Sequence, residues 1–182
     1  MPMIPYTLDL TVEKLKGPTK EQLITGNQWA VTALNRFHAG DSANIEFDID
    51  GVRYSSRIIW KSNFSPAAMR ERTDLANHGG VAIAMFVMSV LLNYEYVEQT
   101  EIGEGVDFKF MEKEPPDDEW NFMRGGHFVE VSGMLEESPS NTLAGRIKMK
   151  QAQISRGSRN SEQASAIVTL FSQPKTVKEV HR

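Results

Sequence analysis

The sequence predicts an α+β fold, and three observations carry this prediction. Segments 6–15 and 45–60 alternate apolar and polar residues, as half-buried strands do. A helix start signal at Ser65 precedes a strongly apolar stretch. Three short runs rich in aromatic and β-branched residues follow, and then a second helical segment and a last strand. From Ser65 onward the predicted order is therefore an αβββαβ core.

The first 64 residues are expected to form a strand, a helix and a β-hairpin, divided from the core at 65–182 near residues 61–65. Alternation predicts a strand over 6–15, and Thr19 is placed as the N-cap of a helix. Asp50-Gly51 lies between two alternating runs and suits a type I′ turn. The segment 45–60 is therefore predicted to be a hairpin, and the two parts are expected to form one unit.

The first core helix is expected to begin with Ser65 as N-cap and Pro66 in its first turn, and to run to about residue 93. Gly79-Gly80 should kink it or let another backbone approach closely. Segment 81–92 is apolar on all sides but shorter than the roughly 20 residues that span a membrane. We expect a buried helix at the centre of the fold or at an interface.

The remaining core elements follow from β-propensity and from turn residues. We expect strands over 94–102, 105–112, 126–135 and 164–174, the last closed by Pro174, and a helix within 138–155.

Composition narrows the class of protein. The chain has 182 residues, 20 Lys and Arg against 24 Asp and Glu, and a formal charge of −4. No large basic field is present to attract nucleic acid, although a nucleic-acid partner stays open. The absence of cysteine excludes disulfides and thiolate metal sites and fits a reducing cytosol. With no signal peptide visible at the N-terminus, we expect a cytoplasmic protein without a membrane partner.

Several common catalytic motifs are missing from the sequence. It has no phosphate-binding loop of the G-x-x-x-x-G-K-[ST] type, no complete dinucleotide fingerprint, no HExxH zinc motif and no G-x-S-x-G elbow. Hydrolytic chemistry would therefore depend on a metal.

Two carboxylates occur where neighbouring strands could bring them together. Asp107 follows a glycine-rich turn early in the second core strand, and Glu130 lies late in the third. If these strands pair through their connecting loop, an early position on one faces a late position on the next. Converging carboxylates form the hard oxygen site that Mg²⁺ prefers, and such a site can activate water for phosphodiester cleavage.

The order of helix, strand with Asp107, strand with Glu130, helix and strand resembles the core of the PD-(D/E)xK nuclease superfamily, over about residues 65–174. The resemblance implies Asp107 and Glu130 as ligands of Mg²⁺ or Mn²⁺, and DNA or RNA as substrate. In that superfamily a lysine follows the second acid by two positions, whereas this chain has Ser132 there. Lys150 lies in the otherwise apolar stripe of the second helix and suits the missing role, as in members whose lysine has migrated to this helix. A lysine directed toward the core needs an acidic partner.

The same resemblance implies a third acid from the first core helix, where Glu71 or Asp74 could approach the metal, and it lets Gln99 orient water. The chain also resembles a group of short bacterial proteins with a similar glycine-aspartate turn and the strand motif "EVSG". That second resemblance implies no activity and suggests an accessory protein linked to mobile elements or phage defence.

Other interpretations stay open at this level. Asp107 can be an ordinary turn residue, Glu130 an exposed strand residue, and Lys150 a side chain that lays its stem over apolar neighbours. The chain could then be a non-catalytic subunit that binds a protein partner or forms a homo-oligomer. A small-molecule sensor is the third alternative, with a pocket lined by Trp29, Trp60 and Trp120.

Overall fold

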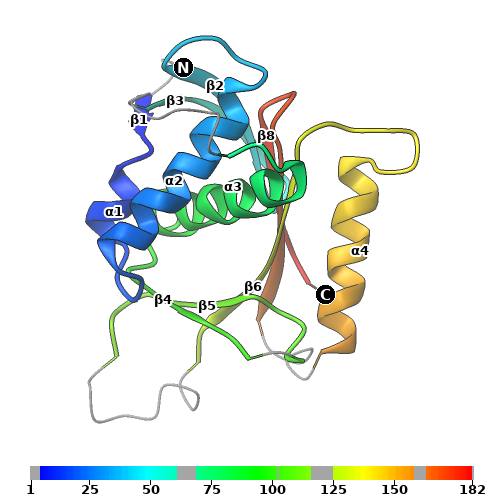
Figure 1. Ribbon diagram of the computed structural model, residues 1–182. Coiled ribbons are helices and arrows are strands. Elements are labelled where there is room, and N and C mark those ends of the chain that lie inside the picture. Colours follow the sequence, from blue (N-terminus) through cyan, green and yellow to red (C-terminus); the bar gives the residue numbers. More distant parts are fainter. Residues whose placement is uncertain (1–4, 61–68, 102, 116–124, 158–162, 182) are drawn as a thin grey trace.

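One mixed sheet joins almost the whole chain. The computed structural model describes residues 5–60, 69–101, 103–115, 125–157 and 163–181, and within them the fold is α+β with an eight-stranded sheet in the order β1-β3-β2-β8-β7-β6-β5-β4 (Figure 1). The elements are β1 (Pro5–Thr7), α1 (Leu10–Lys14), α2 (Lys20–Asn35), β2 (Ser42–Ile49), β3 (Val52–Ile59), α3 (Arg72–Phe86) with a π-helical continuation η2 (Val87–Leu91), β4 (Tyr96–Gln99), β5 (Phe108–Met111), β6 (His127–Met134), α4 (Leu143–Arg156), β7 (Ala164–Leu170) and β8 (Lys175–Val180).

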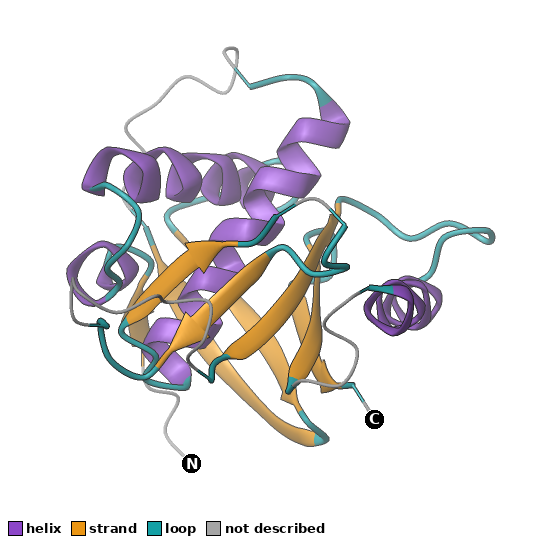
Figure 2. Cartoon of the chain, turned by 90° about the horizontal axis from the view of Figure 1, so that it is seen from below, coloured by secondary structure: helices purple, strands orange, loops and turns teal. Residues whose placement is uncertain are grey.

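Helices cover the two faces of the sheet unequally. α2 and α3 lie on one side and α4 lies on the other (Figures 1 and 2). Because successive strand residues point to opposite faces, Val129 and Val131 of β6 join the large apolar cluster beneath α3. Phe128 and Met134 join a smaller cluster with Ile147 and Ile154 of α4. We call these sides the α3 face and the α4 face.

Glycines bring α3 close to the sheet. A Cβ atom on Gly133 of β6 would lie 1.7 Å from the carbonyl oxygen of Ala76, and one on Gly80 would lie 2.7 Å from the nitrogen of Gly133. The helix continues through Gly79-Gly80, so the glycine pair serves close approach rather than a break. The backbone then widens into the π turn after Phe86.

The apolar helix is enclosed by its own chain. The span Arg72–Leu91 is long and apolar enough to cross a membrane, yet 72% of its most apolar window is buried in the fold. Ile83, Phe86 and Met88 are among the largest fully buried side chains. The stretch is therefore the central core helix of the α3 face.

The N-terminal segment and the helix start differ from the sequence-based expectation. Strand β1 ends at Thr7, and α1 follows, because Leu8, Thr11 and Leu15 point inward at helical spacing. Because residues 6–15 also alternate between apolar and polar, the sequence predicted a strand there instead of a helix. Glu71 caps α3 by accepting a hydrogen bond from the Asp74 amide, whereas the predicted cap residues Ser65 and Pro66 lie outside the described residues.

The hairpin prediction is confirmed, but β8 was not predicted. Ile49 pairs with Val52 around Asp50 and Gly51, whose φ angles of 53° and 89° suit a type I′ turn. Pro174 does not end the sheet, because the chain turns there and returns as β8. β8 lies between β7 and β2, so strands from both sides of the predicted division at 61–65 share one sheet.

Candidate functional site

Glu130 and Lys150 meet on the α4 face. Glu130 lies in the middle of β6 with 1% of its surface exposed. The Nζ atom of Lys150 on α4 donates a hydrogen bond of 2.6 Å to the Oε1 atom of Glu130, and the lysine side chain is 16% exposed. Helix α4 begins where Thr142 accepts a hydrogen bond from the Gly145 amide. The inward-directed lysine thus has an acidic partner in β6.

Asp107 is bound to β6 on both sides of Glu130. Its backbone amide donates to the carbonyl of Val129 over 2.9 Å, and its Oδ2 atom accepts the amide of Val131 over 2.8 Å. β5 and β6 are antiparallel neighbours, with Phe108 opposite Val129. The carboxyl group of Asp107 is therefore held beside the residue that carries the second carboxyl group.

The environment of Glu130 opposes its ionisation. The pKa of Glu130 is raised from its ordinary 4.5 to about 7, mainly by burial and then by the negative charge of Asp107, against the opposing hydrogen bond and charge of Lys150. The buried Oε2 atom of Glu130 has no hydrogen-bond partner among the described residues. A proton on that oxygen, shared toward Asp107, or a cation would satisfy it.

A cavity of about 440 Å³ opens beside Asp107 and Glu130. Its floor is formed where the β4–β5 loop packs on the C-terminal end of α4. A Cβ atom on Gly105 would lie 2.6 Å from the Cα atom of Gly157, and Gly105 has a φ of +78°, so both glycines are needed for this contact. The lining residues are Gln99, Thr100, Glu101, Gly103, Gly105, Val106, Asp107, Glu130, Gln153, Arg156 and Gly157.

The structure brings together Asp107, Glu130 and Lys150. Asp107, Glu130 and Gln99 line the cavity, and Lys150 lies beside it, bonded to Glu130 and Gln153. Asp74 is not brought there. It is exposed in the first turn of α3, the helix that packs on the opposite face of the sheet from Glu130, and Glu71 caps that same turn. In the part of the chain that the structure describes, no three His, Asp, Glu or Cys residues are grouped so as to hold a metal ion.

Two side chains of α4 that contribute to this site, Gln153 and Arg156, were not predicted from the sequence. The Oε1 atom of Gln153 accepts a hydrogen bond of 3.3 Å from Lys150, and Arg156 lines the cavity one turn further along α4. The signal was their spacing, because positions i, i+3 and i+6 stay on neighbouring parts of a helix surface. The serine in place of the superfamily's lysine, Ser132, is buried on the same face as Glu130.

The tryptophan residues do not share a pocket in the described chain. Trp60 is buried after β3, and Trp29 packs against the ring of His78 at 5.2 Å. Neither lines the cavities described here, and Trp120 lies outside the described residues.

Comparison of the chain with protein-family models, with curated proteins and with solved structures finds no match.

Proposed function

We propose that the chain is a divalent-cation-dependent phosphodiesterase of the nuclease type, acting at the cavity beside Glu130. One observation carries the proposal. A buried carboxyl oxygen of Glu130 lacks a donor among the described residues, and the charge of Asp107 acts on the same group. Such an arrangement costs free energy unless a proton or a cation compensates it.

The residues present fit Mg²⁺ or Mn²⁺. Mg²⁺ is commonly bound by one or two carboxylates, with water and substrate phosphate oxygens as its other ligands. Asp107 and Glu130 would provide the two carboxylates, so no third acid is required. When bound, the cation would supply Lewis acidity to the phosphoryl group and to the attacking water.

Lys150 supports the hydrolytic role more than a purely structural one. Its Nζ atom carries three hydrogens, of which Glu130 and Gln153 accept two. The third, in a side chain that keeps 16% exposure, could be donated to a phosphoryl oxygen. Lys150 would thus take the role of the superfamily's lysine, whose position is occupied here by Ser132. It would also hold the Glu130 carboxylate in place.

The charge of α4 favours a phosphate-containing substrate. The helix has basic residues and no acidic one in a chain with a formal charge of −4. Its basic residues are Arg146, Lys148, Lys150 and Arg156. Local cationic surface of this kind attracts the phosphate backbone of DNA or RNA even where the whole protein is acidic.

The element order also supports the proposal. α3, β4, β5, β6, α4 and β7 follow one another as in the αβββαβ core that the sequence resembles. Asp107 immediately precedes the second of these strands and Glu130 is on the third. The rival interpretation, a non-catalytic subunit, drew on the acidic balance, on the missing lysine at Ser132 and on the apolar stretch 81–92. Burial of most of that helix in its own core weakens the third of these grounds.

A cleavage assay tests the proposal. Wild-type protein should cleave single- or double-stranded DNA or RNA with Mn²⁺ or Mg²⁺, and Asp107→Asn or Glu130→Gln should lower the rate at least about a hundredfold. Asp9→Asn removes an exposed carboxylate at the start of α1 that does not line the cavity, and it should leave the rate unchanged. Lack of cleavage of all four substrates by folded wild-type protein would contradict the proposal.

A further inference from the structure

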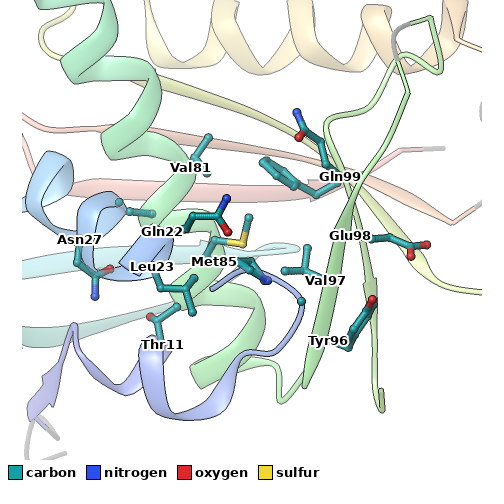
Figure 3. A pocket seen from close by; sticks show the side chains of 15 residues that line it. Thr11, Gln22, Leu23, Asn27, Val81, Met85, Tyr96, Val97, Glu98 and Gln99 are labelled. Atoms are coloured by element: carbon teal, nitrogen blue, oxygen red, sulfur yellow. The ribbon is translucent and has the colours of Figure 1, made fainter. Parts of the chain in front are cut away.

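A second cavity lies on the α3 face, against the other side of β4 and β5. It also has a volume of about 440 Å³ and lies between α2, α3 and the edge strand (Figure 3). Leu23, Val81, Met85 and Val97 give it apolar walls. The complete lining is Thr11, Gly17, Pro18, Gln22, Leu23, Gly26, Asn27, Val81, Ala82, Met85, Tyr96, Val97, Glu98, Gln99 and Phe108.

Among the described residues, no charged side chain is directed into this cavity. Glu98 is the one ionisable acid or base in its lining apart from Tyr96, and Figure 3 shows it pointing away from Gln22, Leu23 and Met85. Its Oε1 atom lies 3.5 Å from the Nζ atom of Lys109. The group that the cavity accepts is therefore neutral, which excludes a phosphate or carboxylate as the part that enters.

Three of the side chains that line the cavity, Gln22, Asn27 and Gln99, carry amides. The Oε1 atom of Gln22 accepts the Thr19 amide in a capping box, which leaves the Nε2 hydrogens of Gln22 as donors for a ligand. Gln99 adds an exposed amide at the rim. Met85 and Phe108 offer a sulfur and a ring surface on which a flat heterocycle can stack. Amide edges with apolar faces match a nucleobase.

The two cavities are adjacent around the end of one strand. Gln99, the last residue of β4, lines both. Asp107 lines the charged cavity, and the next residue, Phe108, lines the neutral one. One nucleotide has the same two parts, a charged phosphate and a neutral flat base.

We propose that the cavity on the α3 face binds the base of an unpaired nucleotide in the strand whose phosphate lies at Asp107 and Glu130. This inference rests on the proposed function. A base can enter such a pocket only when it has left its stack and its partner, so the protein prefers single-stranded or frayed nucleic acid to a closed duplex.

The test compares two valine-to-tryptophan variants. Val81→Trp fills the cavity, and Val52→Trp makes the same change at a residue of β3 that is 67% exposed. Fluorescence anisotropy measures binding of a labelled 12-nucleotide single-stranded DNA and of the matching blunt duplex. EDTA prevents cation-dependent cleavage, so that the labelled strand stays intact during the measurement.

Val81→Trp should weaken binding of the single strand about tenfold, the effect of losing one stacked base, and change duplex binding less than about twofold. Val52→Trp should change neither. Should Val81→Trp fail to fold, Gln99→Ala, at an exposed position, replaces it, with an expected loss of a few fold for the single strand alone. Unchanged single-strand binding, or an equal loss for both ligands, overturns the inference.

A separate Mn²⁺ titration distinguishes failure of the pocket from failure of the proposed function. Selective loss of single-strand binding in Val81→Trp supports the pocket even if wild-type protein binds no Mn²⁺, an outcome that removes the catalytic proposal alone. Normal Mn²⁺ binding with unchanged single-strand binding in Val81→Trp overturns the pocket alone.

Discussion

The two faces of the sheet use burial differently. On the α3 face, rings pack on rings, with Phe86 5.9 Å from Tyr6 and 6.2 Å from Phe47 between ring centres. On the α4 face, a smaller apolar cluster shares its layer with the Glu130–Lys150 ion pair. Buried ion pairs contribute little net stability because desolvation offsets their attraction. The α3 face therefore supplies stability, and the α4 face holds a costly arrangement of the kind found at functional sites.

Gly133→Ala breaks the α3 face at its closest contact. The new Cβ atom would lie 1.7 Å from the backbone oxygen of Ala76, so α3 has to move away from the sheet. The free energy of unfolding should fall by about 3 kcal/mol or more, as measured by urea denaturation. Gly125→Ala is the control, since a Cβ atom there meets nothing within 4 Å. A loss below about 1 kcal/mol for Gly133→Ala would contradict the packing.

Lys150→Met tests the α4 face. Without the ammonium group, ionised Glu130 is left buried and unpaired, so the variant should lose about 3 kcal/mol at pH 8. The loss should be clearly smaller at pH 5, where Glu130, whose pKa of about 7 rises further without Lys150, is protonated. Lys148→Met makes the same change at an exposed position of α4 and should stay within about 0.5 kcal/mol. Equal losses for both variants would argue against a buried pair.

The pH dependence of stability should separate the two faces. The folded-state pKa of Glu130 is raised from 4.5 to about 7, so its contribution is complete below about pH 4.5 and is lost as the pH rises to about 7. Burial on the α3 face lowers the pKa of His127 from 6.5 to about 4, with the charge of Lys178 acting in the same direction. The contribution of His127 is complete above about pH 6.5 and is lost as the pH falls to about 4.

Between about pH 4.5 and 6.5, rising pH lowers the contribution of Glu130 to the free energy of unfolding and raises that of His127. Each contribution changes by up to about 1.4 kcal/mol per pH unit. Relative to wild-type protein, Glu130→Gln should gain stability with rising pH, and His127→Gln should lose it. Urea denaturation at three pH values within this window measures both differences. Two differences that do not change with pH would show that neither side chain titrates as the structure implies.

Local signals in the sequence predicted the elements that depend on few residues. Asp50-Gly51 determines a tight turn by itself, and the hairpin follows from it. α1 was missed because the Leu8–Thr11–Leu15 spacing lies within a pattern that also alternates. β8 was missed because a proline before it was taken as the end of the sheet, although its place between β2 and β7 depends on strands distant in sequence.

The candidate site was predictable in part. Pairing of successive strands is enough to suggest that Asp107 and Glu130 approach each other, and the apolar stripe of α4 marks Lys150 as a residue that needs a partner. The Gly105–Gly157 contact that forms the cavity floor joins residues 52 positions apart through backbone shape alone. Asp74 was misplaced by the resemblance, because a helical position does not reveal which face of the sheet the helix covers.

Calorimetric titration of Mn²⁺ into wild-type protein at pH 8 and pH 6 tests directly whether Asp107 and Glu130 form a cation site. Binding at pH 8 should weaken about tenfold at pH 6, because Glu130, with a pKa of about 7, must lose a proton to bind the ion. The released proton should make the measured heat depend on the ionisation enthalpy of the buffer. Absence of binding at pH 8, or equal binding by the Asp107→Asn, Glu130→Gln double variant, would show that these two carboxylates do not form a cation site.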